Sequence, residues 1–398
     1  MHVCQRWRSV VFASPCRLYL RLVCTDKTPA RSTLDVWPAL PIVIQCHGDY
    51  RTESVDNFIA VLERNDRVEE IELFDVGLHL DKVLAAMQVP LPALEDLTLR
   101  SDDGTVVLPD SFLGGYAPYL EFLELNGISF PGLPTLLLSA TLLVDLRLFN
   151  IPDSGYIPPD TMVTALSALT SLESLFFEFQ SPLSYPYWER RPRPPLTRTV
   201  LPVLTTLGLK GVTEYLEDLV TCIDTPRLNN LQVTSVDQIA FDTPQLVQFI
   251  CRTPRLKTLE KARVTFEGGT AAVNLWQLSS LDHLYTSSWP SLTTLEDIYI
   301  YEAPYWQPHL QNNIENTQWL ELLHPFTSVE SLYLSEGFAP HIVPALQELV
   351  WGRMAEVLPA LRNIFLEGLE PTGPVQKAIE QFVSARLEIG RASCRERV

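Results

Sequence analysis

The sequence predicts an irregular α/β solenoid, with parallel strands on a concave face and helices on a convex face. Two observations predict it: one apolar spacing recurs along the chain, and stretches between its copies have helical spacing. The chain has 398 residues, 46% of them hydrophobic, which is long enough for two or three ordinary domains or one extended repeat array. We expect the array to span residues 18–387.

The recurring spacing is found in eleven segments, which we call the repeat segments. Each has an aliphatic residue at its first and fourth places, and all but one have an aliphatic residue or Phe at the sixth, the exception being Lys261. The segments start at Val68, Leu94, Leu120, Leu143, Leu172, Leu204, Leu228, Leu256, Leu295, Val329 and Leu361. Alternation is the period of a strand, so the fourth and sixth side chains point inward. One such strand cannot bury its apolar side alone, so neighbours stack into a parallel sheet.

The stretches that join the strands are predicted to contain helices. "TESVDNFIAVLERND" (52–66) and "DTMVTALSALTS" (160–171) have helical apolar spacing, and both begin with residues suited to N-caps. Prolines stand just before many strands, where the chain must leave a helix and cannot continue it. These are Pro92, Pro118, Pro202, Pro226, Pro254 and Pro290.

The L-x-x-L-x-L spacing resembles the leucine-rich repeat, which implies a horseshoe-shaped solenoid. The ninth place of that repeat usually holds Asn or Cys, whereas here it is mostly apolar, as at Val76, Ile128, Ile151, Val212, Val236, Val264 and Leu369. Starts 23 to 39 residues apart also indicate an irregular array with uneven curvature. The alternative is a Leu-rich α/β domain whose alternation is coincidental.

Two stretches interrupt the array. Residues 181–198 ("SPLSYPYWERRPRPPLTR") are rich in Pro and Arg and are predicted to form a long loop of extended character. Residues 301–320 are an aromatic, amide-rich insertion. Each is either a binding loop or a surface excursion without a partner.

The first residues have the spacing of an amphipathic helix followed by a turn. In "VCQRWRSVVFASP", Val3 and Trp7 share an apolar helical face, and Ser14-Pro15 ends the helix. The segment resembles the end of an F-box motif, so residues 1–17 are predicted to be a partial F-box. Together with the repeats, it makes the chain similar to fungal F-box/leucine-rich-repeat-like proteins.

This resemblance implies a division of labour. The F-box docks onto a Skp-type adaptor of a cullin–RING ubiquitin ligase, and the repeats hold a substrate. The matching adaptor-binding residues here are Val3, Cys4, Trp7 and Pro15. The Leu-Pro start and first helices of the family's F-box have no counterpart before Val3, so we expect a truncated F-box whose remnant packs on the first repeat.

The last eleven residues, "EIGRASCRERV" (388–398), have no repeat pattern. They resemble one reading frame of a common sequencing-library adapter, and we expect a non-native tail. The alternative is a disordered basic tail.

Composition excludes several classes of function. A formal net charge of −18 argues against partners such as nucleic acids and anionic membranes, which require basic patches. The sequence has no membrane span and no signal peptide, so we expect an intracellular protein, cytoplasmic and/or nuclear. Its seven cysteines lack any CxxC, which favours buried reduced thiols over disulfides or a zinc site. Catalytic and phosphate-binding motifs are absent, which predicts no enzyme activity, cofactor or metal.

The third, fifth and seventh places of the repeat segments should line the concave face. They include nine acidic, three basic and eight aromatic residues. The candidate partner-binding residues are Phe74, Phe122, Glu124, Phe149, Phe176, Glu178, Tyr299, Tyr301, Tyr333 and Phe365. Aromatic side chains ringed by charge are typical of protein-binding patches, here for a partner with basic and apolar anchors. Alternatively, loops cover some aromatics and the acidic charge only keeps the array soluble.

Three hypotheses of function follow. The first is a substrate-recognition subunit of a cullin–RING ubiquitin ligase. The second is a repeat scaffold or decoy that binds protein without recruiting the ligase. The third, a fragment of a recognition receptor, is weaker because no nucleotide-binding module accompanies the repeats.

Overall fold

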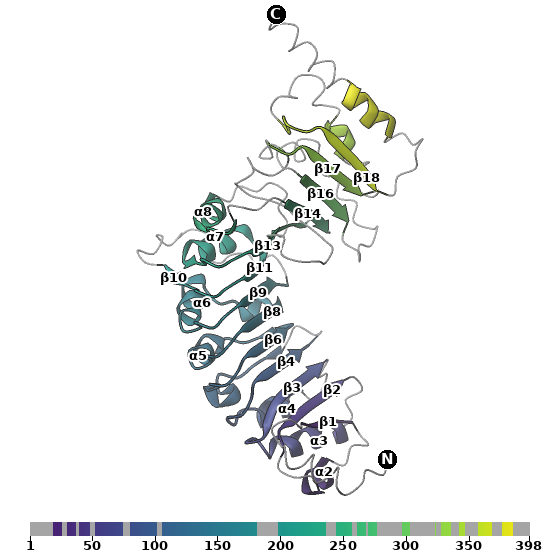
Figure 1. Ribbon diagram of the computed structural model, residues 1–398. Coiled ribbons are helices and arrows are strands. Elements are labelled where there is room, and N and C mark those ends of the chain that lie inside the picture. The colour runs from purple at the N-terminus through teal and green to yellow at the C-terminus, as the bar shows by residue number, and fades with distance from the viewer. Residues whose placement is uncertain are drawn as a thin grey trace, which may run out of the picture. The chain divides into compact units, whose positions relative to one another are not determined.

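The computed structural model of the chain (Figure 1) divides it into two compact units. Unit 1 comprises Met1–Leu183, Pro195–Leu204 and Cys222–Thr225, and unit 2 comprises Ser184–Pro194, Thr205–Thr221 and Pro226–Val398. The structure describes residues 19–25, 30–36, 40–47, 52–74, 80–101, 106–180, 198–235, 244–256, 261–267, 270–276, 297–302, 323, 328–335, 342–346, 357–367 and 376–384.

Unit 1 is built on a parallel sheet whose neighbours follow one another along the chain. Its strands, in spatial order, are β1 (Leu20–Val23), β2 (Ile42–His47), β3 (Val68–Phe74), β4 (Asp96–Arg100), β6 (Phe122–Asn126), β8 (Asp145–Ile151) and β9 (Ser174–Phe179). The five repeat segments from Val68 to Leu172 form β3, β4, β6, β8 and β9, which confirms their prediction as parallel strands. The sequence analysis missed β1 and β2, although Leu20, Leu22 and Cys24 alternate and are buried.

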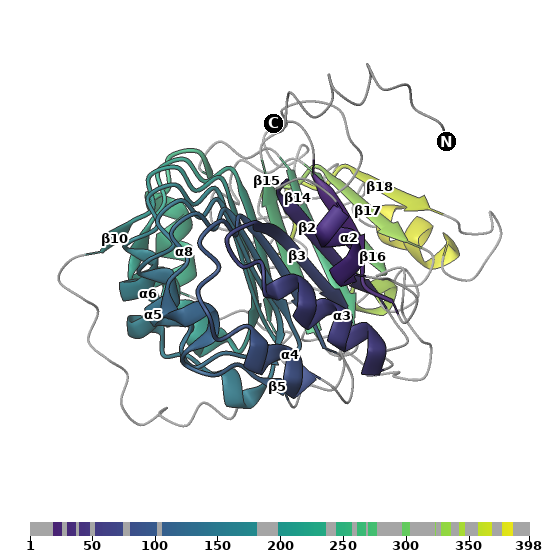
Figure 2. The ribbon, with the colours of Figure 1, turned by 90° about the horizontal axis from the view of Figure 1, so that it is seen from below.

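Helices and single turns return between these strands, and Figure 2 shows α5 and α6 together on one side of them. They are α2 (Ala30–Val36), α3 (Thr52–Leu62), α4 (Leu80–Ala86), η3 (Phe112–Gly115), α5 (Leu133–Leu137), η4 (Asp153–Gly155) and α6 (Pro159–Leu166). In α3, Val55, Phe58 and Val61 lie on one face and are buried, as their three-residue spacing predicts.

Both predicted helices of unit 1 are present, but the predicted cap of α6 is wrong. Its N-cap is Pro158, and no side chain caps the helix. Pro159 occupies the first turn, where a missing N–H leaves no donor to satisfy. The prolines before the strands behave as predicted in the described part of the chain, because Pro92, Pro118, Pro202, Pro226 and Pro254 lie in turns.

The core of unit 1 consists of the inward side chains of the repeat segments. The first, fourth and sixth places of β4, β6 and β8 are at most 3% exposed. Each buried leucine contributes roughly 1.5–3 kcal/mol. Stacking these positions gives unit 1 the architecture of a leucine-rich-repeat-like solenoid.

Short strands pair beside the main sheet. β5 (Val106–Val107) pairs with β7 (Ile128–Ser129), and β10 (Thr199–Val200) pairs with β12 (Ile223–Asp224). Ile128 holds the ninth place of its repeat segment, where Asn would bond neighbouring backbone. Here the backbone pairs directly with β5, so a buried apolar side chain fits.

Unit 2 contains the remaining strands, one of which is reversed. In spatial order they are β11 (Thr206–Gly211), β13 (Asn230–Ser235), β15 (Thr270–Trp276), β14 (Lys261–Glu267), β16 (Asp297–Glu302), β17 (Ser331–Ser335) and β18 (Asn363–Glu367). β15 is antiparallel to both β13 and β14, whereas the other described pairs are parallel. The repeat segment at Leu256 was predicted to continue the parallel run directly, but its strand begins at Lys261 and pairs with β15 in a hairpin.

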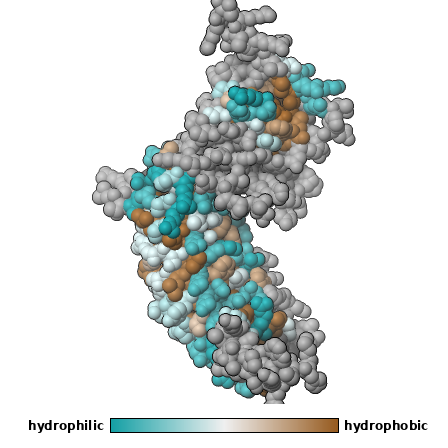
Figure 3. Space-filling view, in the orientation of Figure 1, coloured by the Kyte–Doolittle hydropathy of each residue, from teal (hydrophilic) through white to brown (hydrophobic). Residues whose placement is uncertain are grey.

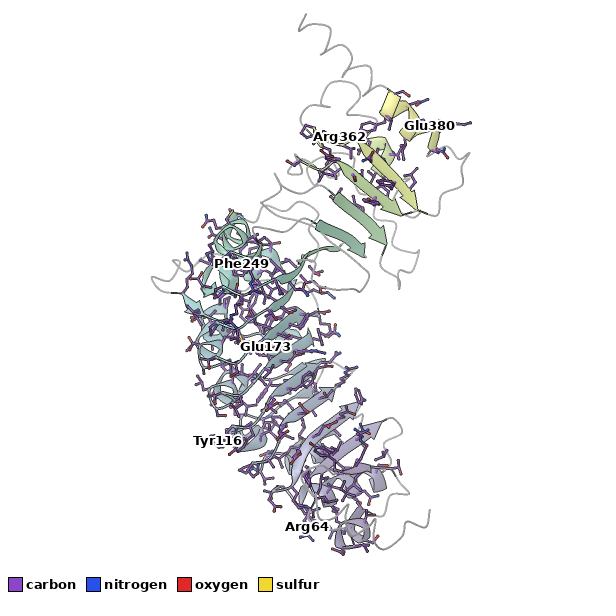
Figure 4. The ribbon with its side chains drawn as sticks, viewed as in Figure 1. Arg64, Tyr116, Glu173, Phe249, Arg362 and Glu380 are labelled. Carbon is purple, nitrogen blue, oxygen red and sulfur yellow. The ribbon has the colours of Figure 1, made fainter. Side chains whose placement is uncertain are left out.

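The described helices of unit 2 are α7 (Thr213–Thr221), α8 (Pro244–Arg252) and the helical residues 342–346 and 376–384. α7 packs against α8, where Phe249 is fully buried (Figure 4). Glu217 of α7 accepts hydrogen bonds at its Oε1 from the backbone N–H groups of Gln245 and Leu246, at 2.7 and 2.9 Å. The backbone N–H groups in the first turn of α8 have no acceptor within the helix, and the Glu217 carboxylate supplies one.

Several predictions fall on parts of the chain outside the described residues. These are the F-box remnant at 1–17, the tail at 388–398, and all of the two interruptions except Arg198, Tyr301 and Glu302. Within the described helices, none is long and apolar enough to cross a membrane.

The described cysteines are free thiols, as the sequence predicts, but not all are buried. Cys24 and Cys46 are buried, whereas Cys251 is exposed on α8. Burial, and secondarily the Cys46 thiol, raises the pKa of Cys24 to about 12, and burial raises the pKa of Cys46 to about 11. The Cys46 thiol donates to the backbone oxygen of Cys24 at 3.4 Å.

We expect iodoacetamide at pH 8 to label Cys251 and to spare Cys24 and Cys46, because the thiolate is the reactive form. Both folded pKa values exceed the ordinary thiol value of about 8.5. The stability linked to these protonated thiols is therefore complete below about pH 8.5 and lost as the pH rises toward 11–12. Peptide mass spectrometry before and after unfolding measures the labelling. Equal labelling of Cys24 and Cys251 in the folded protein would contradict this expectation.

Candidate functional site

The candidate site is the side of the unit 1 sheet that carries the third, fifth and seventh places of its repeat segments, which we call the strand face. The strand register aligns these side chains in three rows. The first is Arg21, Val43, Glu70, Asp96, Phe122, Asp145 and Ser174; the second is Val23, Gln45, Glu72, Thr98, Glu124, Arg147 and Phe176; the third is Phe74, Arg100, Asn126 and Phe149. Neighbours in a row are about 4.8 Å apart.

Two arginines lie over aromatic rings on the strand face. The Arg100 guanidinium is 4.9 Å from the centre of the Phe74 ring. That of Arg147 is 5.1 Å from the Phe122 ring and 5.8 Å from the Phe176 ring. Such contacts contribute about 0.5–1 kcal/mol when exposed and about 2 kcal/mol when desolvated. They hold the arginines and the rings in one layer.

The same arginines pair with two carboxylates. Arg100 donates from its Nε to Oε1 of Glu124 at 2.7 Å, while Arg147 donates to both oxygens of Asp145, at 3.0 and 2.7 Å. Arg147 also lies 3.9 Å from Glu124. The hydrogen bond to Asp145, and then the charges of Asp145 and Glu124, raise the pKa of Arg147 against the effect of its burial.

We call these residues the arginine–aromatic cluster: Phe74, Arg100, Phe122, Glu124, Asp145, Arg147, Phe149 and Phe176. Its charges balance, with two arginines and two carboxylates. The sequence predicts that the Glu124 side chain is exposed on an open face, and the structure shows that this is wrong. Its side chain is only 4% exposed, because Arg100 and Arg147 lie against it.

Next to this cluster lies an acidic corner, formed by residues of β3 and β4 and of the turns that precede β4 and β6. Its members are Glu69, Glu70, Glu72, Glu95, Asp96 and Glu121. Glu72 accepts a hydrogen bond from Gln45 at 2.6 Å. Within the described part of the chain, no member of the acidic corner forms an ion pair.

Burial and the repulsion of like charges raise the pKa of four carboxyls in the acidic corner. Burial is the largest cause of the raised pKa of Glu69, Glu70, Glu95 and Asp96. Repulsion by neighbouring carboxylates raises these pKa values further. Glu95 has this effect on Glu69, and Glu72 and Asp96 have it on Glu70. Glu121 raises the pKa of both Glu95 and Asp96, together with Asp96 in the first case and Glu72 in the second. Arg21 opposes the shift at Glu70. Repulsion between these carboxylates therefore adds to burial in favouring their neutral forms.

The structure separates the predicted aromatic residues into two sets, one in each unit. In unit 1, Phe149 and Phe176 lie 6.0 Å apart, and Glu178 is half-buried on β9. In unit 2, Tyr333 and Phe365 stack at 4.4 Å, with Phe365 46% exposed. Tyr299 is in register with Tyr333, and Tyr301 is in register with Thr265 of β14.

The selection of site residues from sequence missed Arg100 and Arg147. Their signal was present, since both stand at outward places beside Phe residues, in the two repeats that flank the repeat of Glu124. It also missed exposed aromatics elsewhere on unit 1. Tyr116 and Tyr119, each 57% exposed, follow η3, and Tyr116 lies on the helical side of the sheet (Figure 4).

The remaining surface offers few other candidates. The side of unit 1 shown in Figure 3 is mixed, with small hydrophobic areas among hydrophilic residues. No group of His, Cys, Asp or Glu suited to a metal ion occurs among the residues that the structure places. Val3, Cys4, Trp7 and Pro15 lie outside the described residues.

Comparison with known proteins gives a structural similarity without a family. No protein-family profile and no curated protein matches the chain. Among solved structures, it is similar to the leucine-rich repeat-containing protein LegL7 from Legionella pneumophila, at 10% sequence identity and a TM-score of 0.32. The alignment covers 92% of this chain and 98% of LegL7. A TM-score this low does not establish a shared fold.

Proposed function

We propose that this chain is a protein-binding repeat protein without catalytic activity, and that its partner docks on the strand face of unit 1. The arginine–aromatic cluster is the observation that carries the proposal. Arg and aromatic residues are enriched at the energetic centres of protein interfaces. Here their contacts hold them in place before any partner arrives, which lowers the entropic cost of binding.

The finer proposal is that the bound partner is a substrate for ubiquitination. It is supported by the resemblance of Val3, Cys4, Trp7 and Pro15 to the end of an F-box, which would dock onto a Skp-type adaptor of a cullin–RING ligase. The alternative is a scaffold that binds the same partner and recruits no ligase.

Affinity capture with face variants tests the proposed site. Phe149→Ala/Phe176→Ala removes two rings from the strand face, and we expect it to weaken capture of the partner about tenfold or more. Tyr116→Ala/Tyr119→Ala is the matched control, since it removes two exposed rings from the helical side. Proteins retained equally by both variants would contradict docking on the strand face.

Co-precipitation with the adaptor tests the finer proposal separately. Wild type should recover a Skp-type adaptor, and Trp7→Ala should lose it while keeping the captured partner. Recovery of the partner without the adaptor by wild type would instead favour the ligase-independent scaffold.

A further inference from the structure

We infer that the partner presents a basic, extended segment, and that this segment lies across β3 and β4 against Glu70, Glu72 and Asp96. The inference rests on the proposed function and specifies the chemistry of the partner and its place on the strand face. It follows from three properties of that face: Arg100 and Arg147 are already paired with carboxylates, part of the negative charge has no ion-pair partner, and aromatic rings border that charge.

The pairing of Arg100 and Arg147 disfavours an acidic partner at the arginine–aromatic cluster. Arg100 directs Nε and a terminal nitrogen to Glu124, and Arg147 makes a two-pronged contact with Asp145. An acidic ligand would have to break these pairs and leave the buried Glu124 carboxylate without a partner, which is unfavourable.

The unmatched charge selects a basic partner. Glu70 and Asp96 are direct neighbours in the first row, and Glu72 follows in the second. Like charges held this close repel one another, and a Lys or Arg placed between them relieves the repulsion. Charge complementarity of this kind directs both encounter and choice of partner.

The spacing of the strand face fits an extended segment. Residues two apart on a strand, such as Glu70 and Glu72, are about 6.6 Å apart along it. Alternate residues of an extended peptide have the same spacing, so basic residues at every second position would meet successive acidic side chains. Phe74 follows Glu72 on β3, and Phe122 is the row neighbour of Asp96. These carboxylates therefore border the arginine–aromatic cluster, in which Arg100 lies over Phe74 and Arg147 lies over Phe122.

Binding should depend on pH with a defined sign. The charged groups facing Glu70 are Glu72, Asp96 and Arg21, and those facing Asp96 are Glu121, Glu72, Glu70 and Glu95. Since the pKa values of Glu70 and Asp96 are raised, these carboxyls begin to take up protons above the ordinary carboxyl range near pH 4. A bound cation lowers those pKa values again. Affinity therefore falls as the pH is lowered from neutral toward the carboxyl range, and binding in that range releases protons.

Fluorescence anisotropy with a labelled peptide of four Lys-Ser pairs tests the inference. Glu70→Gln/Glu72→Gln/Asp96→Asn should weaken binding of this probe about tenfold or more. The control variant Asp56→Asn/Asp110→Asn/Asp160→Asn removes the same amount of negative charge from exposed positions elsewhere on unit 1. It should weaken binding of the probe less than about threefold. Because the first variant removes repulsion, its thermal unfolding midpoint should equal or exceed that of wild type, so unfolding cannot explain the lost binding.

Three results would overturn the inference. Equal weakening by both variants would mean that the probe responds only to the net charge of −18. Absence of probe binding to wild type, with capture of a natural partner still sensitive to Phe149→Ala/Phe176→Ala, would refute the basic segment and leave the proposed function standing. A glutamate-serine peptide of equal length should not bind, and binding by it would also refute the inference.

Discussion

Gly127→Ala should destabilise unit 1 by roughly 3–5 kcal/mol, which is at the upper end of single-residue effects. Gly127 has a φ of +68°, and a Cβ built on it would lie 1.9 Å from the backbone oxygen of Ser101. Ser101 cannot move away freely, because its N–H donates to the oxygen of Asn126 at 2.8 Å. Gly127 itself donates to the oxygen of Phe149 at 2.9 Å, so three successive repeats meet at this turn.

Gly115→Ala is the matched control for this prediction. Gly115 has nearly the same φ, +69°, but no atom lies within 4 Å of the position its Cβ would take. Its replacement should cost about 1 kcal/mol, the price of a left-handed backbone for a residue with a Cβ. Urea unfolding followed by circular dichroism compares the two variants. Equal losses would show that the backbone angle, and not the approach of Ser101, sets the cost at Gly127.

Arg100→Met/Arg147→Met should destabilise unit 1 by about 3–5 kcal/mol, because it leaves a buried carboxylate without a counter-charge. The Glu124 side chain is 4% exposed, and these two arginines are its described ionic partners. Adding Glu124→Leu to the double variant should restore much of the loss, since an apolar residue needs no partner at that position. Such recovery on a third substitution is the mark of coupled residues.

Arg31→Met/Arg64→Met provides the surface comparison for this prediction. Arg31 pairs with Glu63 at 2.6 Å and Arg64 with Asp35 at 3.6 Å, but all four side chains are at least 53% exposed. Exposed pairs contribute about 0–1 kcal/mol each, so this variant should remain near wild-type stability. Urea unfolding midpoints measure all three variants. A triple variant as unstable as the double would instead assign the loss to the packing of the arginine stems on the rings.

Much of the strand framework could be predicted because its signal is local. The segments from Val68 to Leu172 alternate between inward and outward residues, and this period decides which side chains are buried in any strand. The first two strands were missed because Leu20–Val23 is short and Ile42–His47 begins with three apolar residues in a row. Uniform apolarity does not distinguish a strand from a buried helical segment.

The candidate site could be predicted only in part. Outward places were correctly identified for Phe122, Phe149 and Phe176, since each follows from its own strand. The burial of Glu124 could not be read from its repeat segment. It depends on Arg100, 24 residues earlier, and on Arg147 in the following repeat, which the strand register brings alongside.

The sequence by itself determined the repeating strand-and-helix plan of unit 1 and the side chains that form its core, because apolar spacing within a segment controls burial. Only the tertiary structure decided which charges on the strand face are neutralised and which are not. It also placed the reversed strand β15 between β13 and β14. Both outcomes depend on contacts between strands far apart in the chain. Ion pairs across strands and hydrogen bonds between strands have no period within a segment, so they exist only once the chain has folded.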